Sequence, residues 1–219
     1  MALRDLFTIA ESKSVRFTAS ELRDAYFNSQ ELKEAGNADD EMKTASFIAQ
    51  QLKDAGYTTV DLREHFTIAE FKAGRFTASK LRNAQFNLRE LKDVGYTATA
   101  LRDLFAIADL KSAGSTASEL KTAHFTSHEM EKAGYSAVEM KAAGFTTQEL
   151  KDGGYTALAL QDLFTIAELK SVRFTASDLK DANFTPQKLK EAGYAADEMK
   201  TAGVTMPMTR ILLCSPTAA

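Results

Sequence analysis

The stretch Tyr135–Gly154, YSAVEMKAAG followed by FTTQELKDGG, contains two consecutive copies of a ten-residue repeat. Each copy begins with an aromatic residue and a Ser or Thr, has Glu at the fifth place and Met or Leu at the sixth, and ends in Gly. Twenty such repeats, with sequence drift, follow one another from Phe7 to Gly203. Because a self-similar chain folds by stacking its repeats, this pattern predicts the architecture before any other motif is considered.

Three of the repeats are one residue short. They begin at Tyr57, Tyr96 and Tyr155, and their junctions to the next repeat read LREHF, LRDLF and LQDLF. These short repeats divide the array into blocks of six, four, six and four repeats, and the blocks recur with a period of 98 residues, from Phe7 to Phe105. We expect a bend or a change of pitch at each short repeat.

Local signals predict that each repeat is one short helix. The second place is Thr, Ser or Asn in 16 of the 20 repeats, and these side chains accept hydrogen bonds from the first N–H groups of a helix. The fifth place is Glu or Gln in 13 of the 20, which completes a capping box such as Thr146 with Glu149. The aromatic residue and the apolar sixth place form a hydrophobic staple, and Gly at the tenth place supplies the left-handed residue that ends the helix.

A helix this short is marginal in isolation, so stacking has to stabilise it. Apolar residues at the first, third, sixth and ninth places form one stripe along the helix. The sequence therefore predicts an all-α solenoid of about twenty short capped helices over residues 1–203, with neighbouring helices folded back on each other as hairpins. Residues 204–219 leave the repeat and are predicted to form a C-terminal cap or tail.

The alternative fold is a pentapeptide-like β-helix, which the alternation of aromatic residues and Leu every five residues favours. Large residues at the fourth place, such as Gln30 and Arg89, count against it because they would crowd the interior of that fold. The nine-residue repeats would also break a five-residue frame.

The repeated part resembles the decapeptide short-helix repeat arrays, whose pattern is A-G-[FY]-T-A-x-E-L-K. The resemblance rests on segments such as AGFTTQELK (Ala143–Lys151) and covers most of the chain. It implies an α-helical repeat scaffold and no known active site.

Composition excludes several functional classes. The net charge of −3 and the 26% of charged residues give no general attraction to phosphates or membranes. We find no apolar run of the ~20 residues that a membrane span needs, and no signal peptide at the start of the sequence. A single cysteine, Cys214, leaves no internal disulfide and no metal cluster. We expect a soluble protein of the cytoplasm or of another reducing intracellular compartment.

No residue group carries a catalytic signature. The sequence lacks a paired-carboxylate, nucleophile–base or Gly-rich phosphate motif, so we expect no enzyme activity, no cofactor and no small-molecule substrate. His124 and His128 have the spacing of two metal ligands on one helix face, but the repeat frame puts them on either side of a helix boundary. We therefore predict no metal site.

Two sets of residues remain as candidate surfaces. Lys or Arg occupies the seventh place in 18 of the 20 repeats. These rows either contact an acidic partner or nucleic acid, or pair with the acidic residues beside them. The fourth and tenth places vary most. They either form a surface that recognises a partner or vary only because they are exposed to solvent. The candidates of the first set are Lys33, Lys53, Lys92, Lys121, Lys151 and Lys180, and those of the second are Arg16, Arg75, His124 and Arg173.

These observations favour a non-enzymatic structural scaffold that mediates protein–protein interaction or self-assembly. The alternative is a modular nucleic-acid-binding α-repeat protein with one helix or hairpin per base. The negative net charge makes a nucleic-acid partner unfavourable. The Phe and Tyr side chains are also expected to pack in the hydrophobic staples, which leaves no exposed aromatic rings on which bases could stack.

Overall fold

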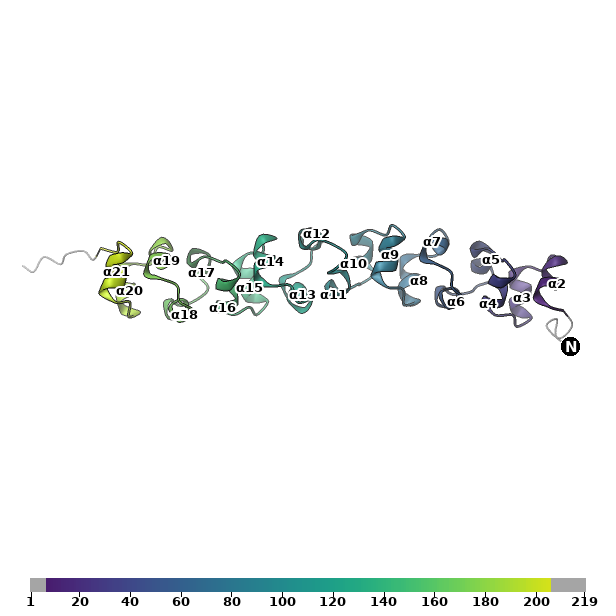
Figure 1. Ribbon diagram of the computed structural model, residues 1–219, viewed down its shortest axis with the longest axis horizontal. Helices are drawn as coiled ribbons and strands as arrows, with labels where there is room; N and C mark the ends of the chain where they lie inside the picture. The colour runs from purple at the N-terminus through teal and green to yellow at the C-terminus, as the bar shows by residue number, and fades with distance from the viewer. Residues whose placement is uncertain (1–6, 206–219) are drawn as a thin grey trace, which may run out of the picture. The chain divides into compact units, whose positions relative to one another are not determined.

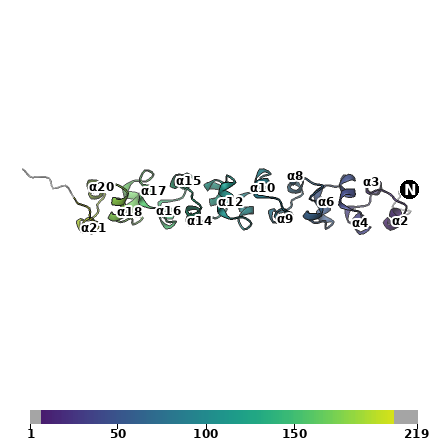
Figure 2. The ribbon, with the colours of Figure 1, turned by 90° about the horizontal axis from the view of Figure 1, so that it is seen from above.

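The computed structural model describes residues 7–205 of the 219-residue chain. The expectations for Met1–Leu6, for Cys214 and for the predicted tail beyond Thr205 therefore lie outside the described residues. Within residues 7–205 the chain forms twenty α-helices and no strand (Figures 1 and 2). The predicted all-α repeat fold is confirmed, and the β-helix alternative is rejected.

Most helices have six residues, one for each repeat. In chain order they are α2 (Ile9–Ser14), α3 (Ala19–Asp24), α4 (Ser29–Glu34), α5 (Asp39–Thr44), α6 (Ala49–Asp54), α7 (Thr59–Leu62), α8 (Ile68–Ala73), α9 (Ala78–Asn83), α10 (Leu88–Asp93), α11 (Ala98–Leu101), α12 (Ile107–Ser112), α13 (Ala117–Thr122), α14 (Ser127–Lys132), α15 (Ala137–Ala142), α16 (Thr147–Asp152), α17 (Ala157–Leu160), α18 (Ile166–Ser171), α19 (Ala176–Asp181), α20 (Pro186–Glu191) and α21 (Ala196–Thr201).

The described helices group into two compact units: unit 1 contains α2 to α12 and unit 2 contains α13 to α21. In unit 1, α3 packs on α5, α5 on α7 and α7 on α9, while α4 packs on α6 and α6 on α8. In unit 2, α13 packs on α15, α14 on α16, α17 on α19 and α19 on α21. Within each unit, helices thus stack on the second helix after them, so one coil of the stack consists of two repeats.

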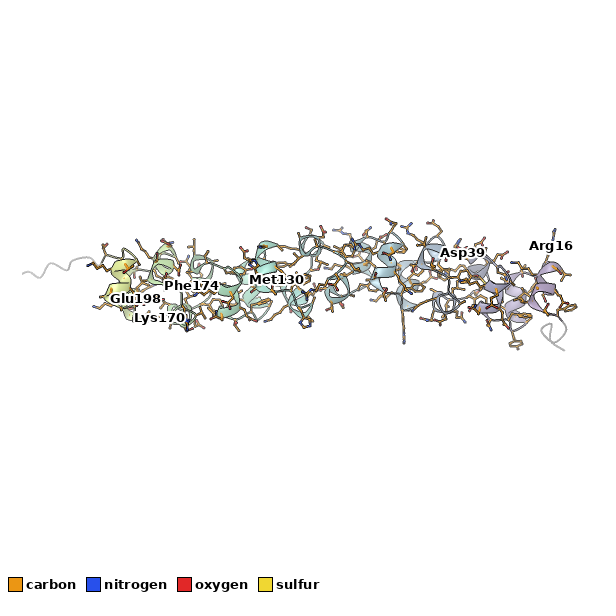
Figure 3. The ribbon with its side chains drawn as sticks, in the orientation of Figure 1. Arg16, Asp39, Met130, Lys170, Phe174 and Glu198 are labelled. Carbon is orange, nitrogen blue, oxygen red and sulfur yellow. The ribbon has the colours of Figure 1, made fainter. Side chains whose placement is uncertain are left out.

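The sixth place of each repeat forms the core. Its Leu, Met or Phe side chain is completely buried in nearly every described repeat, and Figure 3 shows Met130 in the interior of unit 2. Burying one such side chain contributes about 1.5–3 kcal/mol. In α8 this place holds Phe71, whose ring packs edge-on against Phe76 at 5.0 Å between centroids. Ser12 in α2 is the polar exception: it is fully buried and its hydroxyl has no hydrogen-bond partner.

The three short repeats differ from the others at their C-terminal ends. Their helices α7, α11 and α17 have only four residues each. The residues that follow, Arg63, Arg102 and Gln161, keep right-handed helical backbone angles. These repeats lack the tenth place, which has the left-handed conformation in the full-length repeats. The chain therefore enters the next repeat without a left-handed residue.

Candidate functional site

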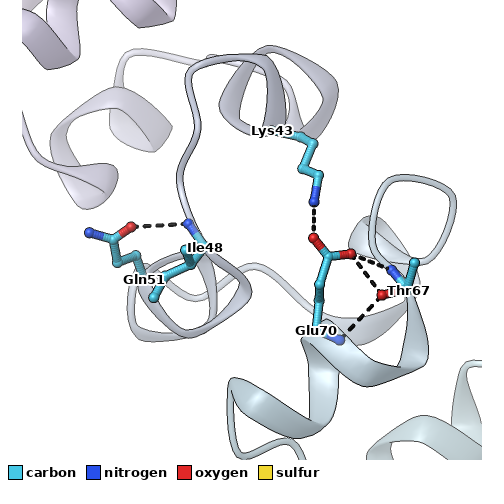
Figure 4. Close-up of polar contacts among 5 residues, drawn as sticks. All are labelled: Lys43, Ile48, Gln51, Thr67 and Glu70. Carbon is cyan, nitrogen blue, oxygen red and sulfur yellow. Dashed lines mark hydrogen bonds and ion pairs between the residues drawn. The ribbon is translucent and has the colours of Figure 1, made fainter.

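The second and fifth places begin the helices. In twelve of the described helices the second-place side chain accepts a hydrogen bond from the fifth-place N–H, and the fifth-place carboxylate accepts one from the second-place N–H. Before α8, Thr67 N–H donates to Glu70 Oε2 at 2.8 Å and Glu70 N–H donates to Thr67 Oγ1 at 3.3 Å (Figure 4). Hydrogen bonds from the Lys43 ammonium and from the Thr67 backbone lower the pKa of the Glu70 carboxyl. These places thus serve the fold.

The lysine at the seventh place reaches the C-terminal end of the helix two repeats later. Lys151 Nζ donates to the carbonyl oxygens of Val172 and Arg173, both at 2.6 Å, and lies 4.9 Å from the centroid of the Phe174 ring. A cation is favourable there because the last carbonyls of a helix lack intrahelical partners and carry partial negative charge. The ring below adds a cation–π contact. The lysine therefore connects one coil to the next.

All six lysines predicted as a partner surface have contacts of this kind. Their ammonium groups are engaged within the stack, with backbone, hydroxyl or ring partners in place of the acidic neighbours that the sequence suggested. Lys33 lies 4.6 Å from the Tyr57 ring centroid, Lys53 donates to the Gly74 and Arg75 carbonyls, Lys92 to the Ser115 hydroxyl, Lys121 to the Gly144 carbonyl and Lys180 to the Ala202 carbonyl. Whether they also contact a partner stays a prediction.

Lys43 departs from this rule next to a short repeat. Its ammonium forms an ion pair with Glu70 and lies 3.9 Å from the centroid of the Phe66 ring (Figure 4). The equivalent lysine of the duplicated block, Lys141, donates instead to the Leu163 carbonyl and lies 4.4 Å from the centroid of the Phe164 ring. The ion pair with Glu70 is therefore particular to the junction in unit 1.

The tenth place is left-handed in every full-length repeat of the described chain. Nine glycines there have positive φ, and so do eight residues that are not glycine. The four variable-place candidates belong to the second group: φ is 66° at Arg16, 54° at Arg75, 61° at His124 and 66° at Arg173. For a residue with a Cβ atom this conformation costs roughly 1–2 kcal/mol.

The non-glycine residues are not spread evenly over the blocks. They occupy the tenth place in seven of the eight repeats that open a block, as its first or second repeat, but only once, at Ser46, in the nine other full-length repeats. The seven are Arg16, Tyr26, Arg75, Gln85, His124, Arg173 and Asn183. Their side chains therefore recur in register with the blocks.

The two variable places meet in grooves between stacked helices. One groove in unit 2, of about 640 Å³, is lined by Arg173 at a tenth place, Ser177 at a fourth place, and Asp197 and Thr201 of α21. Two grooves of unit 1 have the same register, with Ser46 and Gln50 in one and Gly56 and Val60 in the other. Residues from different coils thus line each of these three recesses, which the repeat pattern alone did not predict.

Sequence reasoning also missed a hydrogen bond between coils. The hydroxyl of Tyr155 donates to the carbonyl of Tyr135 at 2.6 Å, and Tyr194 does the same to Phe174 at 2.7 Å. Burial raises the pKa of Tyr155 and of Tyr194 to about 12. The only available signal was that all three short repeats begin with Tyr, not Phe.

The histidines do not assemble a metal centre. His128 Nδ1 lies 3.3 Å from the Gly153 carbonyl, and His65 Nε2 lies 3.0 Å from Asp39 Oδ2. Within residues 7–205 no group of three or more His, Cys, Asp or Glu side chains is arranged to hold a metal ion. Over the same residues, no helix is long and apolar enough to cross a membrane.

The stacked helices and the grooves between them define an α-helical repeat protein. The family model of the decapeptide repeat region matches residues 6–65, 104–163 and 161–210, which is most of the chain. The chain therefore belongs to the decapeptide repeat region family. The first two matched segments begin 98 residues apart, at 6 and 104, in agreement with the period of the blocks. No curated protein and no solved structure matches the chain.

Proposed function

We propose that this chain is a non-enzymatic scaffold that binds protein partners or other copies of the chain through the exposed tenth-place side chains at its block starts. The observation that carries the proposal is the set of seven non-glycine residues in left-handed conformation at the block starts. Glycine at those places would relieve a backbone strain of roughly 1–2 kcal/mol each. A side chain that lowers stability where it stands, and recurs in register with the blocks, is best explained by contact with a partner.

The exposure of these side chains supports the proposal. Tyr26 is 80% exposed, although a Tyr side chain at the tenth place of a repeat adds nothing to the core. Arg16 projects away from unit 1 in Figure 3. Exposed aromatic residues and arginines are the residue types enriched where proteins bind each other.

The test separates binding from folding. A variant with Gly at all seven block-start places should be at least as stable as the native chain, with a gain of up to about 0.5–1 kcal/mol per site, because strain is relieved while chain entropy is lost. The same variant should fail to retain the proteins that co-purify with the tagged native chain from its source cells, and should show reduced self-association in sedimentation.

Ser46→Gly is the matched control, since Ser46 is left-handed but lies inside a block. It should relieve strain and leave partner capture unchanged. If the seven-site variant retains the same partners and the same oligomeric state as the native chain, the proposal is wrong.

A further inference from the structure

One block of the array is basic, although the whole chain has a net charge of −3. Residues 66–104, which contain α8 to α11, carry seven Lys or Arg against four Asp or Glu. The corresponding block 98 residues later, residues 164–203, carries six of each. The blocks on either side of residues 66–104 in the sequence are acidic, with seven basic against eleven acidic residues in 7–65 and five against eight in 105–163.

Three of the basic side chains in this block are not engaged in stacking. Lys72 donates to the Val94 carbonyl and Arg82 lies 5.0 Å from the centroid of the Phe105 ring, as seventh-place residues do. Arg75, Lys80 and Arg89, by contrast, are exposed, and their side chains have no hydrogen bond or ion pair within residues 7–205. We call these three residues the cationic segment.

The three cations come from three consecutive repeats. Arg75 occupies the left-handed tenth place after α8, Lys80 the fifth place in α9, and Arg89 the fourth place in α10. Lys80 replaces the usual capping carboxylate, so Thr77 caps α9 alone. Helix α9 therefore lacks a capping box and has in place of its carboxylate a cation without an internal partner.

Lys80 also lines a groove. The recess of about 420 Å³ is formed with Lys53, Tyr57, Val60 and Phe76. Lys53 is already bound to the Gly74 and Arg75 carbonyls, while Val60 is 61% exposed. The groove thus offers an apolar wall and an unpaired ammonium, which suits a segment carrying both acidic and apolar side chains.

We propose that the cationic segment binds an acidic stretch of polypeptide. This inference deepens the scaffold function proposed above and rests on it. Charge complementarity supports it, since the cations are exposed and unpaired. A nucleic acid fits less well, because a polyanion extending beyond the block would meet the acidic block 7–65 of the same unit. The rings of Phe66, Phe71 and Phe76 are also buried and present no surface on which bases stack.

The duplicated block supplies a matched exchange of residues. Asp178 and Gln187 occupy the places in residues 164–203 that Lys80 and Arg89 occupy in residues 66–104. Asp178 fits the same frame, because its carboxylate accepts a hydrogen bond from the Thr175 N–H at 2.7 Å. K80D/R89Q therefore removes two cations with residues that this backbone already accommodates, and D178K/Q187R is the reciprocal exchange.

The experiment measures the binding of fluorescein-labelled poly-L-glutamate, about twenty residues long, to the full chain by fluorescence anisotropy at low salt. We expect K80D/R89Q to bind roughly tenfold more weakly than the native chain and D178K/Q187R to bind several-fold more tightly. Raising the salt concentration should reduce these differences. Circular dichroism verifies that each variant is folded, and the gain in D178K/Q187R tests the proposal even if K80D/R89Q is misfolded.

Two results would overturn the proposal. Equal poly-L-glutamate binding by the native chain and both variants would show that the cationic segment does not bind acidic polypeptide. Tighter binding of a single-stranded DNA of similar length, with the same response to the exchanges, would assign the segment to nucleic acid. If poly-L-glutamate does not bind but the native chain still loses its partners in the seven-site Gly variant, this inference fails and the scaffold function stands.

Discussion

Replacing a seventh-place lysine should destabilise the stack, because this side chain links two coils. In Lys151→Met the aliphatic stem is kept and the charged head is removed. The change deletes the two hydrogen bonds to the Val172 and Arg173 carbonyls and the contact with the Phe174 ring at 4.9 Å. It should leave α16 itself intact, since the end of this helix uses the backbone carbonyl of Lys151 and not its side chain.

The expected loss is about 1–2 kcal/mol. A hydrogen bond from a charged group contributes about 1.5–3 kcal/mol when well buried, but Lys151 is only half-buried, so we discount the pair of bonds to about 1 kcal/mol. The cation–π contact contributes about 0.5–1 kcal/mol. The favourable position of a cation at a helix end accounts for part of the same sum.

The control is Lys188→Met in α20. Lys188 is exposed at a fifth place, and its side chain has no hydrogen bond or ion pair within residues 7–205. Urea unfolding followed by far-UV circular dichroism should shift to lower urea for Lys151→Met alone. Because repeat arrays need not unfold in two states, amide hydrogen exchange in α16 and α18 gives the local measure. Equal unfolding of the two variants would refute the linking role of the lysine.

Three further predictions concern the same coils. Tyr155→Phe should cost about 0.5–1.5 kcal/mol in urea unfolding, because it removes the 2.6 Å hydrogen bond to the Tyr135 carbonyl; no change would mean that the bond contributes nothing net. Gly153→Ala should destabilise by about 1–3 kcal/mol, since the new Cβ would lie 2.6 Å from Ser127 Oγ and 2.9 Å from Ser127 C; a neutral result would show that the helices separate easily. The Thr146 backbone N–H and hydroxyl lower the pKa of Glu149, so its cap contributes above the ordinary value of 4.5 and is lost as pH falls further. The stability difference between the native chain and Glu149→Gln should therefore vanish in acid, and a constant difference would refute this.

The local fold could be predicted from the sequence because each repeat contains the residues that begin and end its own helix. The pair Thr146 and Glu149 forms the capping box that the sequence indicated. The left-handed turn at Gly144 could also be predicted, since glycine adopts that conformation without steric cost. Such signals lie within ten residues of each other, where pattern and structure correspond directly.

Contacts between coils could not be predicted in the same way. Lys151 and Val172 are 21 residues apart, and the sequence offered nearer carboxylates as partners for the lysine. The stacking of alternate helices determines the partner of Lys151, because it brings a helix end within reach of the ammonium. The grooves could not be predicted for the same reason: Arg173 and Thr201 lie in different repeats and line one recess only after stacking.

Different places of the repeat have different structural roles, which explains how such an array can change its surface without changing its fold. In the second repeat of the two duplicated blocks the core residue is the same, Leu81 in one and Leu179 in the other. The residues beside it differ: Lys80 is replaced by Asp178, an exchange of charge at a place that caps the helix in one block and is unpaired in the other. Because core, caps and linking lysines occupy fixed places, duplication copies the frame together with its surface. Substitutions at the remaining places can therefore change the groove chemistry of one copy at little cost to the stack, and the basic block 66–104 differs from its duplicate at such places.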